Sequence, residues 1–304
     1  MGIGTGDDPP FAGMHDASAL VCGSSVQALA MVLDGRARRT FSIAGGLHHA
    51  HRSRAAGFCV YNDPAVAIAE ARRANPDLRV LYIDIDAHHG DGVQEAFYTS
   101  AEVMTISLHE TGAFLFPGTG FPAEAGEGEG LGYAANVPLP PWAGDDCYRL
   151  AFEGVVEPLA ERFRPDVIVA QLGADAHYAD PLTQLGLTLP GYRWLVRRIL
   201  TLSDALCDGR LCALGGGGYA AHTTVPRAWT WVMAELMGDD LPEALPEAWR
   251  TRVRGFLSED APLTLGADDH FDLPRARWQQ VVEETRGIVG ETRAAVFPHL
   301  GLTP

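Results

Sequence analysis

Short apolar segments of this chain end repeatedly in histidine and aspartate clusters, and this pattern restricts the fold more than any other sequence feature. Residues 39–43, 78–83 and 167–172 are rich in Val, Ile, Leu, Phe and Tyr, which is typical of buried strands in a parallel sheet. Ligands of open α/β sheets bind beyond the carboxyl ends of the strands. We therefore expect the polar clusters to converge although they are far apart in the sequence.

Stretches with helical periodicity alternate with these segments. Helices are expected near residues 17–33, 63–73, 146–162, 191–207, 219–237 and 275–295, and further strands at 103–107 and 211–214. Asp63 is the expected N-cap of the second helix, with Pro64 in its first turn. The alternation predicts the α/β class: a single doubly wound domain with a mainly parallel central sheet flanked by helices.

Composition and charge exclude several classes of protein. The chain has 304 residues, of which 47% are hydrophobic, so it can bury a large core. The net charge of −16 argues against binding nucleic acid or an anionic membrane through bulk charge. The cysteines lack paired spacing, so no disulfide framework is implied. No segment reads as a leader or a membrane span, and a cytoplasmic enzyme is expected.

Asp86, His88 and Asp175 are candidate metal ligands. Asp86 and His88 are alternate residues just past a strand end and can point the same way, and Asp175 can close the site from another strand. One imidazole and two carboxylates suit Zn²⁺ or Fe²⁺ and leave positions for water and substrate. The alternative is that both carboxylates cap loops and His88 is an ordinary polar residue. The number of histidines and aspartates at strand ends argues against it.

The histidine pair His48 and His49 is better suited to proton transfer than to metal binding, because the metal ligands are already supplied. Imidazole titrates near neutral pH, and each ring needs a carboxylate to fix its tautomer. Asp84 and Asp91 are the carboxylates not yet used. The sequence therefore predicts two His/Asp dyads beside the metal.

Tyr219 follows four consecutive glycines after the strand at 211–214. Glycine lets the backbone turn sharply and approach a site closely, so the phenol can be presented to a developing oxyanion. Phosphate binding by this run is a weak alternative, because the chain has no lysine for a P-loop. His89 and His109 receive no role.

Several motifs, in order and with matching spacing, resemble the metal-dependent histone deacetylase family, which has the arginase/deacetylase fold. They are residues 45–50, 57–63, 82–92, 116–120, 173–175 and 215–219, and the resemblance covers roughly 2–237. It is strongest to the bacterial acetoin-utilisation deacetylases, which are similar to class I histone deacetylases. The resemblance implies one deacetylase domain over 1–304, with a catalytic core in 1–237 and a helical extension in 238–304 packed on it.

The resemblance also implies a role for each residue of the site. The implied groups are Asp86, His88 and Asp175 for one catalytic metal, zinc or iron; His48, His49, Asp84, Asp91 and Tyr219 for catalysis; Asp7, Gly57, Phe58, Phe116 and Leu182 for the substrate; and Asp84, Asp86, His88, Ser107, Leu108, Phe97, Ser100 and Val103 for potassium. His49 with Asp91 is the implied general base and later acid, and Tyr219 is implied to polarise the carbonyl.

The implied reaction is hydrolysis of the Nε-acetyl-lysine amide in proteins, with an acetylated enzyme such as acetyl-CoA synthetase as substrate. Acetylpolyamine hydrolysis and a truncated, inactive metal-binding protein are the alternatives. The related arginase and agmatinase group binds two manganese ions and wants acidic residues at the positions of Gly90 and His177. The family's domain usually begins upstream with two more strands, and without them the strand at 39–43 is expected at an exposed sheet edge.

Overall fold

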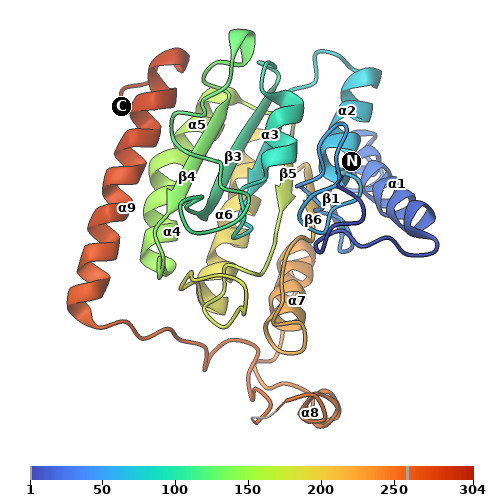
Figure 1. Ribbon diagram of the computed structural model, residues 1–304, viewed down its shortest axis with the longest axis vertical. Helices are drawn as coiled ribbons and strands as arrows, with labels where there is room; N and C mark the ends of the chain where they lie inside the picture. Colours follow the sequence, from blue (N-terminus) through green and yellow to red (C-terminus); the bar gives the residue numbers. More distant parts are fainter. Residues whose placement is uncertain (1, 258–259) are drawn as a thin grey trace.

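A six-stranded sheet with helices on both faces forms the centre of the computed structural model, which describes residues 2–257 and 260–304 (Figure 1). The strands are β1 (Arg39–Ser42), β2 (Val80–Asp84), β3 (Val103–Glu110), β4 (Ala134–Leu139), β5 (Val167–Gln171) and β6 (Leu211–Leu214). Their order is β1-β6-β5-β2-β3-β4, and every neighbouring pair is parallel. The predicted fold class is confirmed.

The helices pack as two layers on this sheet. They are α1 (Met14–Leu33), α2 (Asp63–Ala74), α3 (Asp91–Phe97), α4 (Asp145–Ala151), α5 (Glu157–Phe163), α6 (Leu189–Leu206), α7 (Thr224–Met237), α8 (Glu247–Arg254) and α9 (Arg275–Val296), and a π-helical turn at Phe152–Val156 joins α4 to α5. Because side chains alternate along a strand, Val80 and Tyr82 pack toward α1 and α2, whereas Leu81 and Ile83 face the larger cluster beneath α4 to α6.

Four local features differ from the sequence expectation. The strand β4 and the short helices α3 and α8 were not predicted; β4 contains Pro138, which an edge strand tolerates. The N-cap of α2 is Asn62, whose side chain accepts a hydrogen bond from the backbone N–H of Ala65 at 2.9 Å. Asp63 is instead the first residue of the helix, and its carboxylate is used elsewhere.

The two edge strands, β1 and β4, have different surroundings. The helix α9 covers β4, and Thr292 Oγ1 donates to the carbonyl of Asn136 at 2.6 Å. β1 pairs only with β6 among the residues that the structure describes, so the edge position expected for residues 39–43 is confirmed.

The helix α1 lies over β1 and α2. By length and apolar composition alone it passes as a candidate membrane span, which differs from the expectation of none. Its side chains Cys22, Leu29 and Val32 are buried, but only 22% of the apolar span is buried in the structure, and Leu20 is 76% exposed.

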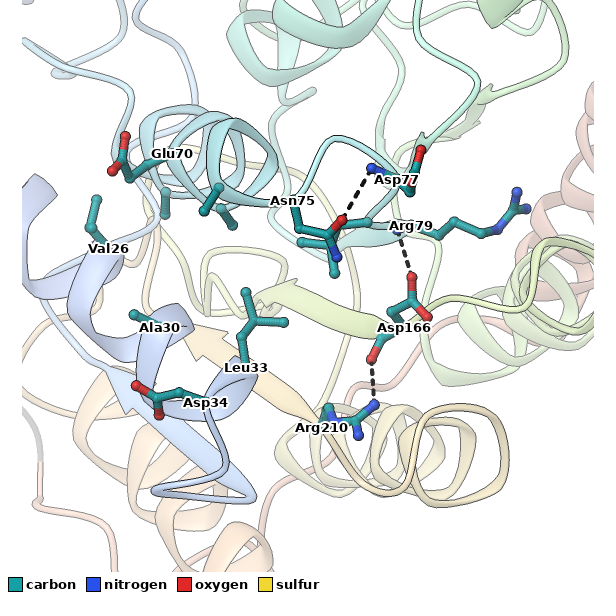
Figure 2. Close-up of a pocket in the computed structure, with 14 residues that line it drawn as sticks. Val26, Ala30, Leu33, Asp34, Glu70, Asn75, Asp77, Arg79, Asp166 and Arg210 are labelled. Atoms are coloured by element: carbon teal, nitrogen blue, oxygen red, sulfur yellow. Dashed lines mark hydrogen bonds between the residues drawn. The ribbon is translucent and has the colours of Figure 1, made fainter.

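A cavity of about 950 Å³ lies between α1, α2 and the amino ends of β2, β5 and β6 (Figure 2). Asp166 connects the segments that precede β2 and β6 at this cavity. The backbone N–H of Arg79 donates to Asp166 Oδ2 at 2.8 Å, and Arg210 Nη1 donates to the Asp166 carbonyl at 3.4 Å. The cavity is therefore at the end of the sheet opposite the predicted site and contains none of its residues.

Candidate active site

Four neighbouring strands deliver the predicted site residues to one end of the sheet. β1, β6, β5 and β2 are consecutive in the strand order and parallel, so the loops that follow them lie side by side. These loops carry the histidine pair, the Asp86 and His88 motif, Asp175 and Tyr219.

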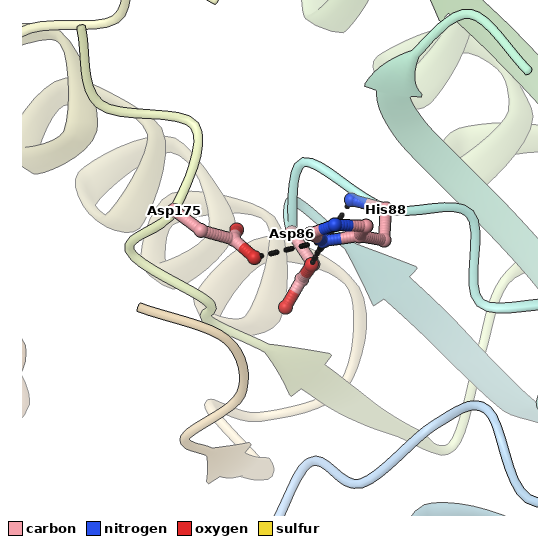
Figure 3. A group of neighbouring side chains, drawn as sticks. All are labelled: Asp86, His88 and Asp175. Atoms are coloured by element: carbon pink, nitrogen blue, oxygen red, sulfur yellow. Dashed lines mark hydrogen bonds and ion pairs between the residues drawn. The ribbon is translucent and has the colours of Figure 1, made fainter. Parts of the chain in front are cut away.

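The three predicted metal ligands lie together and are buried (Figure 3). His88 Nδ1 is 3.1 Å from Asp86 Oδ1 and 3.0 Å from Asp175 Oδ2, and one donor atom from each residue lies within 4.8 Å of the others. Backbone and side-chain N–H groups hold the remaining carboxylate oxygens. Gln171 Nε2 and the N–H of Gly217 each donate to Asp86 Oδ2 at 2.7 Å.

The electrostatics of this cluster suit a bound cation. Burial by itself lowers the pKa of His88, but the carboxylates of Asp175 and Asp86 outweigh it and raise the pKa to about 11. Burial and the charge of Asp86 raise the pKa of Asp175 to about 7. Two buried carboxylates that face one imidazole nitrogen form a mixed oxygen and nitrogen donor set, which fits a borderline divalent cation such as Zn²⁺ or Fe²⁺.

The predicted dyads are both formed. His48 Nδ1 is 2.8 Å from Asp84 Oδ2, and His49 Nδ1 is 2.8 Å from Asp91 Oδ1. The two Nε2 atoms are 3.1 Å apart, and His48 Nε2 is 3.9 Å from Asp86 Oδ1. Each carboxylate therefore orients its imidazole so that Nε2 faces the cluster of ligands.

The two histidines differ in charge. Burial lowers the pKa of His49 to about 4, and the neighbouring His48 contributes to this shift. Burial also lowers the pKa of His48, but the carboxylates of Asp84 and Asp86 outweigh it and raise the pKa to about 9. At neutral pH, His48 is a cation that donates from Nε2, and His49 is neutral with a proton-accepting Nε2.

Tyr219 lies next to the candidate metal ligands, as expected from the glycine run. Its ring centroid is 6.3 Å from that of His88. A Cβ atom at Gly217 would be only 2.1 Å from Asp175 Oδ2, so glycine is required for this approach. Burial raises the pKa of Tyr219, and the nearby carboxylates of Asp86 and Asp175 add to the shift. The phenol therefore keeps its proton and can donate it in a hydrogen bond.

Phe58 and Phe116, predicted to contact the substrate, flank the site. Phe116 is edge-on to His49 at 5.0 Å between ring centroids, and Phe58 is edge-on to Tyr219 at 5.9 Å. Gly57 lies against His49 and Phe116, where a Cβ atom would be 2.4 Å from the His49 ring and 2.8 Å from the Phe116 ring. Both phenylalanines are about half exposed.

The other two predicted substrate residues are exposed. Leu182 is 47% exposed, and its backbone N–H donates to Asp180 Oδ1 at 3.0 Å. Asp7 lines a cavity of about 650 Å³ together with Gly57, Phe116 and Asp91. The structure therefore places Asp7 at the same cavity as three other predicted site residues, and the substrate roles of Asp7 and Leu182 stay predictions.

The residues predicted to bind potassium fall into two compact groups. The register of β2 and β3 places Asp84 opposite Ser107. Leu108 follows Ser107 in β3, and Asp86 and His88 follow Asp84 after the end of β2. Phe97 is the last residue of α3 and Val103 the first of β3, and Ser100 lies in the connection between them, where its N–H donates to the Phe97 carbonyl at 2.9 Å. Their role in ion binding stays a prediction.

Two polar residues that the sequence reasoning missed support the site from within buried strands. Gln171 Nε2 donates to Asp86 Oδ2 and to the carbonyl of Gly46, and Gln171 Oε1 accepts from the N–H of Gly173 at 2.8 Å. Tyr82 donates to Asp84 Oδ2 at 2.7 Å. The signal available for Gln171 was a polar side chain at the end of an otherwise apolar strand.

Asp63 is a third missed residue. Its carboxylate accepts hydrogen bonds from the N–H of Gly46 at 3.0 Å and of Leu47 at 2.8 Å, and from Ser25 Oγ at 2.5 Å. Asp63 is fully buried, so these bonds hold the loop that presents His48 and His49.

Replacing Asp63 with Ala is therefore expected to destabilise the fold. The substitution leaves buried N–H groups without acceptors, which costs about 3 kcal/mol and lowers Tm by roughly 6 to 12 °C. Thermal unfolding followed by circular dichroism measures this shift. Asp77→Ala, at an exposed aspartate after the same helix, is the control. A wild-type Tm for Asp63→Ala would contradict the assigned role.

The parallel sheet, the Asp/His/Asp cluster and the two dyads together are those of a metal-dependent hydrolase. Comparison with known proteins makes the class more specific: the family described as histone deacetylase domain matches residues 2–236. The chain belongs to the histone deacetylase family, which confirms the resemblance found in the sequence.

Individual relatives agree with this assignment. The chain is 48% identical over 299 residues to the acetoin utilization protein AcuC of Bacillus subtilis (strain 168), covering 97% of this chain and 76% of that protein. AcuC of Staphylococcus xylosus is 38% identical and covers 91% of this chain, which spans 72% of that protein. A solved histone deacetylase homolog from Aquifex aeolicus superposes with a TM-score of 0.82 at 36% identity, covering 93% of this chain and 77% of that chain.

Proposed function

We propose that this protein hydrolyses the Nε-acetyl-lysine amide of acetylated proteins and releases acetate. The observation that carries the proposal is the His49 and Asp91 dyad beside the buried ligand cluster: Asp91 Oδ1 is 2.8 Å from His49 Nδ1, and the ring centroids of His49 and the candidate ligand His88 are 5.8 Å apart. Membership of the histone deacetylase family supports the same chemistry. Acetylated enzymes such as acetyl-CoA synthetase are the proposed partners, and the cytoplasm is the proposed location.

A divalent cation held by Asp86, His88 and Asp175, with zinc or iron as the proposed ion, would supply Lewis acidity for the carbonyl and the water. His49 takes the proton of the attacking water at Nε2 and later returns it to the leaving amine. The cationic His48 stabilises the negative charge that develops beside it. Tyr219 donates its phenolic proton in a hydrogen bond to the developing oxyanion.

The walls of the site suit the long apolar chain of acyl-lysine. Phe58 and Phe116 present aromatic faces and edges on two sides of the catalytic residues, and neither carries a charge. Methylene groups gain from burial against such surfaces. Asp7 at the rim is the proposed anchor for the substrate backbone, and potassium is the proposed structural ion near Asp84 and Ser107.

One supporting observation concerns the arginase and agmatinase alternative. Gly90 has no side chain, and His177 Nε2 is hydrogen-bonded to Asp269 at 2.9 Å, so neither position offers a carboxylate to a second metal. The proposed site therefore holds one catalytic metal.

A deacylation screen tests the proposal directly. The purified protein is loaded with Zn²⁺, Fe²⁺ or Mn²⁺ and assayed on acetyl-lysine peptides, acetylated acetyl-CoA synthetase and N-acetylputrescine. We expect acetate release from the peptides and the protein, and none after chelation. The chain contains no lysine, so antibody detection of acetyl-lysine reports the substrate alone. Turnover of N-acetylputrescine only would instead identify an acetylpolyamine hydrolase.

Tyr219→Phe is expected to lower kcat while metal binding stays intact. The phenol is the one side-chain donor proposed for the oxyanion, and loss of such a donor costs about 2.7 to 4 kcal/mol, or roughly 100- to 1000-fold in kcat. Steady-state kinetics on an acetyl-lysine peptide, with metal content determined in parallel, measure the effect. Tyr61→Phe removes an equivalent hydroxyl at a partly exposed site and serves as control. Unchanged turnover of Tyr219→Phe would remove Tyr219 from the mechanism.

A further inference from the structure

A segment near the carboxyl end of the chain crosses the catalytic end of the sheet. Residues 262–274, the C-terminal strap, lead from α8 toward α9 and pass the loop of residues 172–188 that joins β5 to α6 (Figure 1). We call this the ligand loop, because it contains Asp175. The strap lies outside the matched family domain at 2–236.

Asp269 is the buried polar residue at the centre of this crossing, and its side chain is only 3% exposed. Asp269 Oδ2 accepts hydrogen bonds from His177 Nε2 at 2.9 Å and from the N–H of Leu189 at 2.7 Å. Asp269 Oδ1 accepts from the Tyr178 hydroxyl at 3.2 Å and lies 3.8 Å from Arg227 Nη2. One carboxylate thus joins the ligand loop, the start of α6 and the helix α7.

The hydrogen bonds fix the tautomer of His177. Its Nδ1 accepts from the N–H of Ala179 at 3.1 Å, so the proton is on Nε2 and is donated to Asp269. Burial by itself raises the pKa of Asp269, but the bond from His177, that from Leu189 and the charge of Arg227 outweigh it. The pKa lies below its ordinary value, and the carboxylate is ionised.

The ligand loop connects this cluster to the reacting groups. His177 is two residues from Asp175, and Asp180 in the same loop accepts from the backbone N–H of Tyr219 at 2.7 Å. Thr183 Oγ1 donates to the Asp175 carbonyl at 2.6 Å. A displacement of the loop therefore moves a metal ligand and the phenol together.

Aromatic contacts from the strap reinforce the link. Phe271 stacks on Tyr178 with ring centroids 5.6 Å apart and planes at 22°. A Cβ atom at Gly186 would be 2.5 Å from the Phe271 ring, so the strap also presses on the far end of the ligand loop. Both ends of the loop are held from outside the matched domain.

We propose that Asp269 is a positioning residue that fixes Asp175 and Tyr219 in their working geometry through His177 and the ligand loop. Groups that orient metal ligands from behind typically change metal affinity or activity by about 10- to 100-fold. The expected effect on kcat rests on the proposed function. The expected effect on Zn²⁺ affinity rests only on the cluster of Asp86, His88 and Asp175.

Asp269→Ala, Asp269→Asn and Asp272→Asn test the proposal in the full-length protein. Asp269→Ala is expected to weaken Zn²⁺ affinity, measured by competition with a chromophoric chelator, by about 10- to 100-fold, and to lower kcat similarly with little change in KM. Asp269→Asn keeps a carbonyl acceptor for His177 and Leu189 and is expected to recover most of both. Asp272→Asn is the matched control, because this side chain is 93% exposed, and it is expected to leave Zn²⁺ affinity and kcat unchanged.

The outcomes distinguish a positioning role from a structural one. A lower Tm for Asp269→Ala with wild-type Zn²⁺ affinity and kcat would overturn the proposal. Hydrogen–deuterium exchange of residues 172–188 in His177→Asn, which removes the Nε2 donor to Asp269, provides a second readout if Asp269→Ala does not fold. Faster exchange in His177→Asn supports the proposal, and unchanged exchange together with wild-type Zn²⁺ affinity in this variant opposes it. An inactive wild type whose Zn²⁺ affinity still depends on Asp269 would reject the proposed function alone.

Discussion

Asp86→Asn is expected to abolish metal binding and deacetylation together while the fold is kept. Asp86 Oδ2 accepts from Gln171 Nε2 and from the N–H of Gly217, so the carbonyl oxygen of Asn is expected to occupy this position. Its amide NH₂ then replaces Asp86 Oδ1, the oxygen that faces His88 Nδ1 at 3.1 Å. The variant therefore presents a hydrogen-bond donor without negative charge at the position where the cation needs a carboxylate oxygen as ligand.

The magnitude follows from the role of the cation. Metal ions contribute several kcal/mol of transition-state stabilisation, so the loss in kcat is expected to be at least about 1000-fold. Metal content after gel filtration and steady-state turnover of an acetyl-lysine peptide measure the two effects. Asp77→Asn, the same change at an exposed aspartate, is expected to match the wild type. Stoichiometric zinc and normal turnover in Asp86→Asn would locate the metal elsewhere.

The main features of the fold and the site could be predicted because they depend on local sequence. Residues 78–83 and 167–172 are apolar except for Arg79 and Gln171, as expected of strands buried on both faces, and the strands β2 and β5 form there. Parallel strands end at the same edge, so Asp86, His88 and Asp175 were expected to meet. The cluster in Figure 3 agrees with that expectation.

The supporting residues could not be predicted because their partners are distant in the sequence. Asp269 is 92 positions from His177, and nothing in a Pro-rich, acidic segment indicates that one of its aspartates is buried. Asp63 has the position of a helix cap, and only the packing of α2 against the histidine loop shows its real contacts. β4 has a sequence of low strand propensity and depends on pairing with β3 and on cover from α9.

His49→Asn is expected to lower kcat by about 10²- to 10⁴-fold, the range typical of a lost general base. The Nδ2 atom of Asn overlays the imidazole Nδ1, so the hydrogen bond to Asp91 Oδ1, now 2.8 Å, can be kept. What disappears is Nε2, the neutral nitrogen that faces the ligand cluster 3.1 Å from His48 Nε2. Metal content is expected to stay at the wild-type level, since His49 is not a proposed ligand.

His51→Asn is the matched control, because His51 Nε2 contacts the other oxygen of the same carboxylate, Asp91 Oδ2, at 3.1 Å. Both variants replace a histidine beside Asp91 with Asn. His51→Asn removes the Nε2 contact to Asp91, whereas His49→Asn keeps its bond to Asp91 and loses the Nε2 atom that lies 3.1 Å from His48 Nε2. A kcat loss in His51→Asn that stays below about tenfold would attribute the larger effect to the Nε2 atom of His49. Equal losses in the two variants would instead assign the effect to Asp91, and the general base would have to be sought in His48.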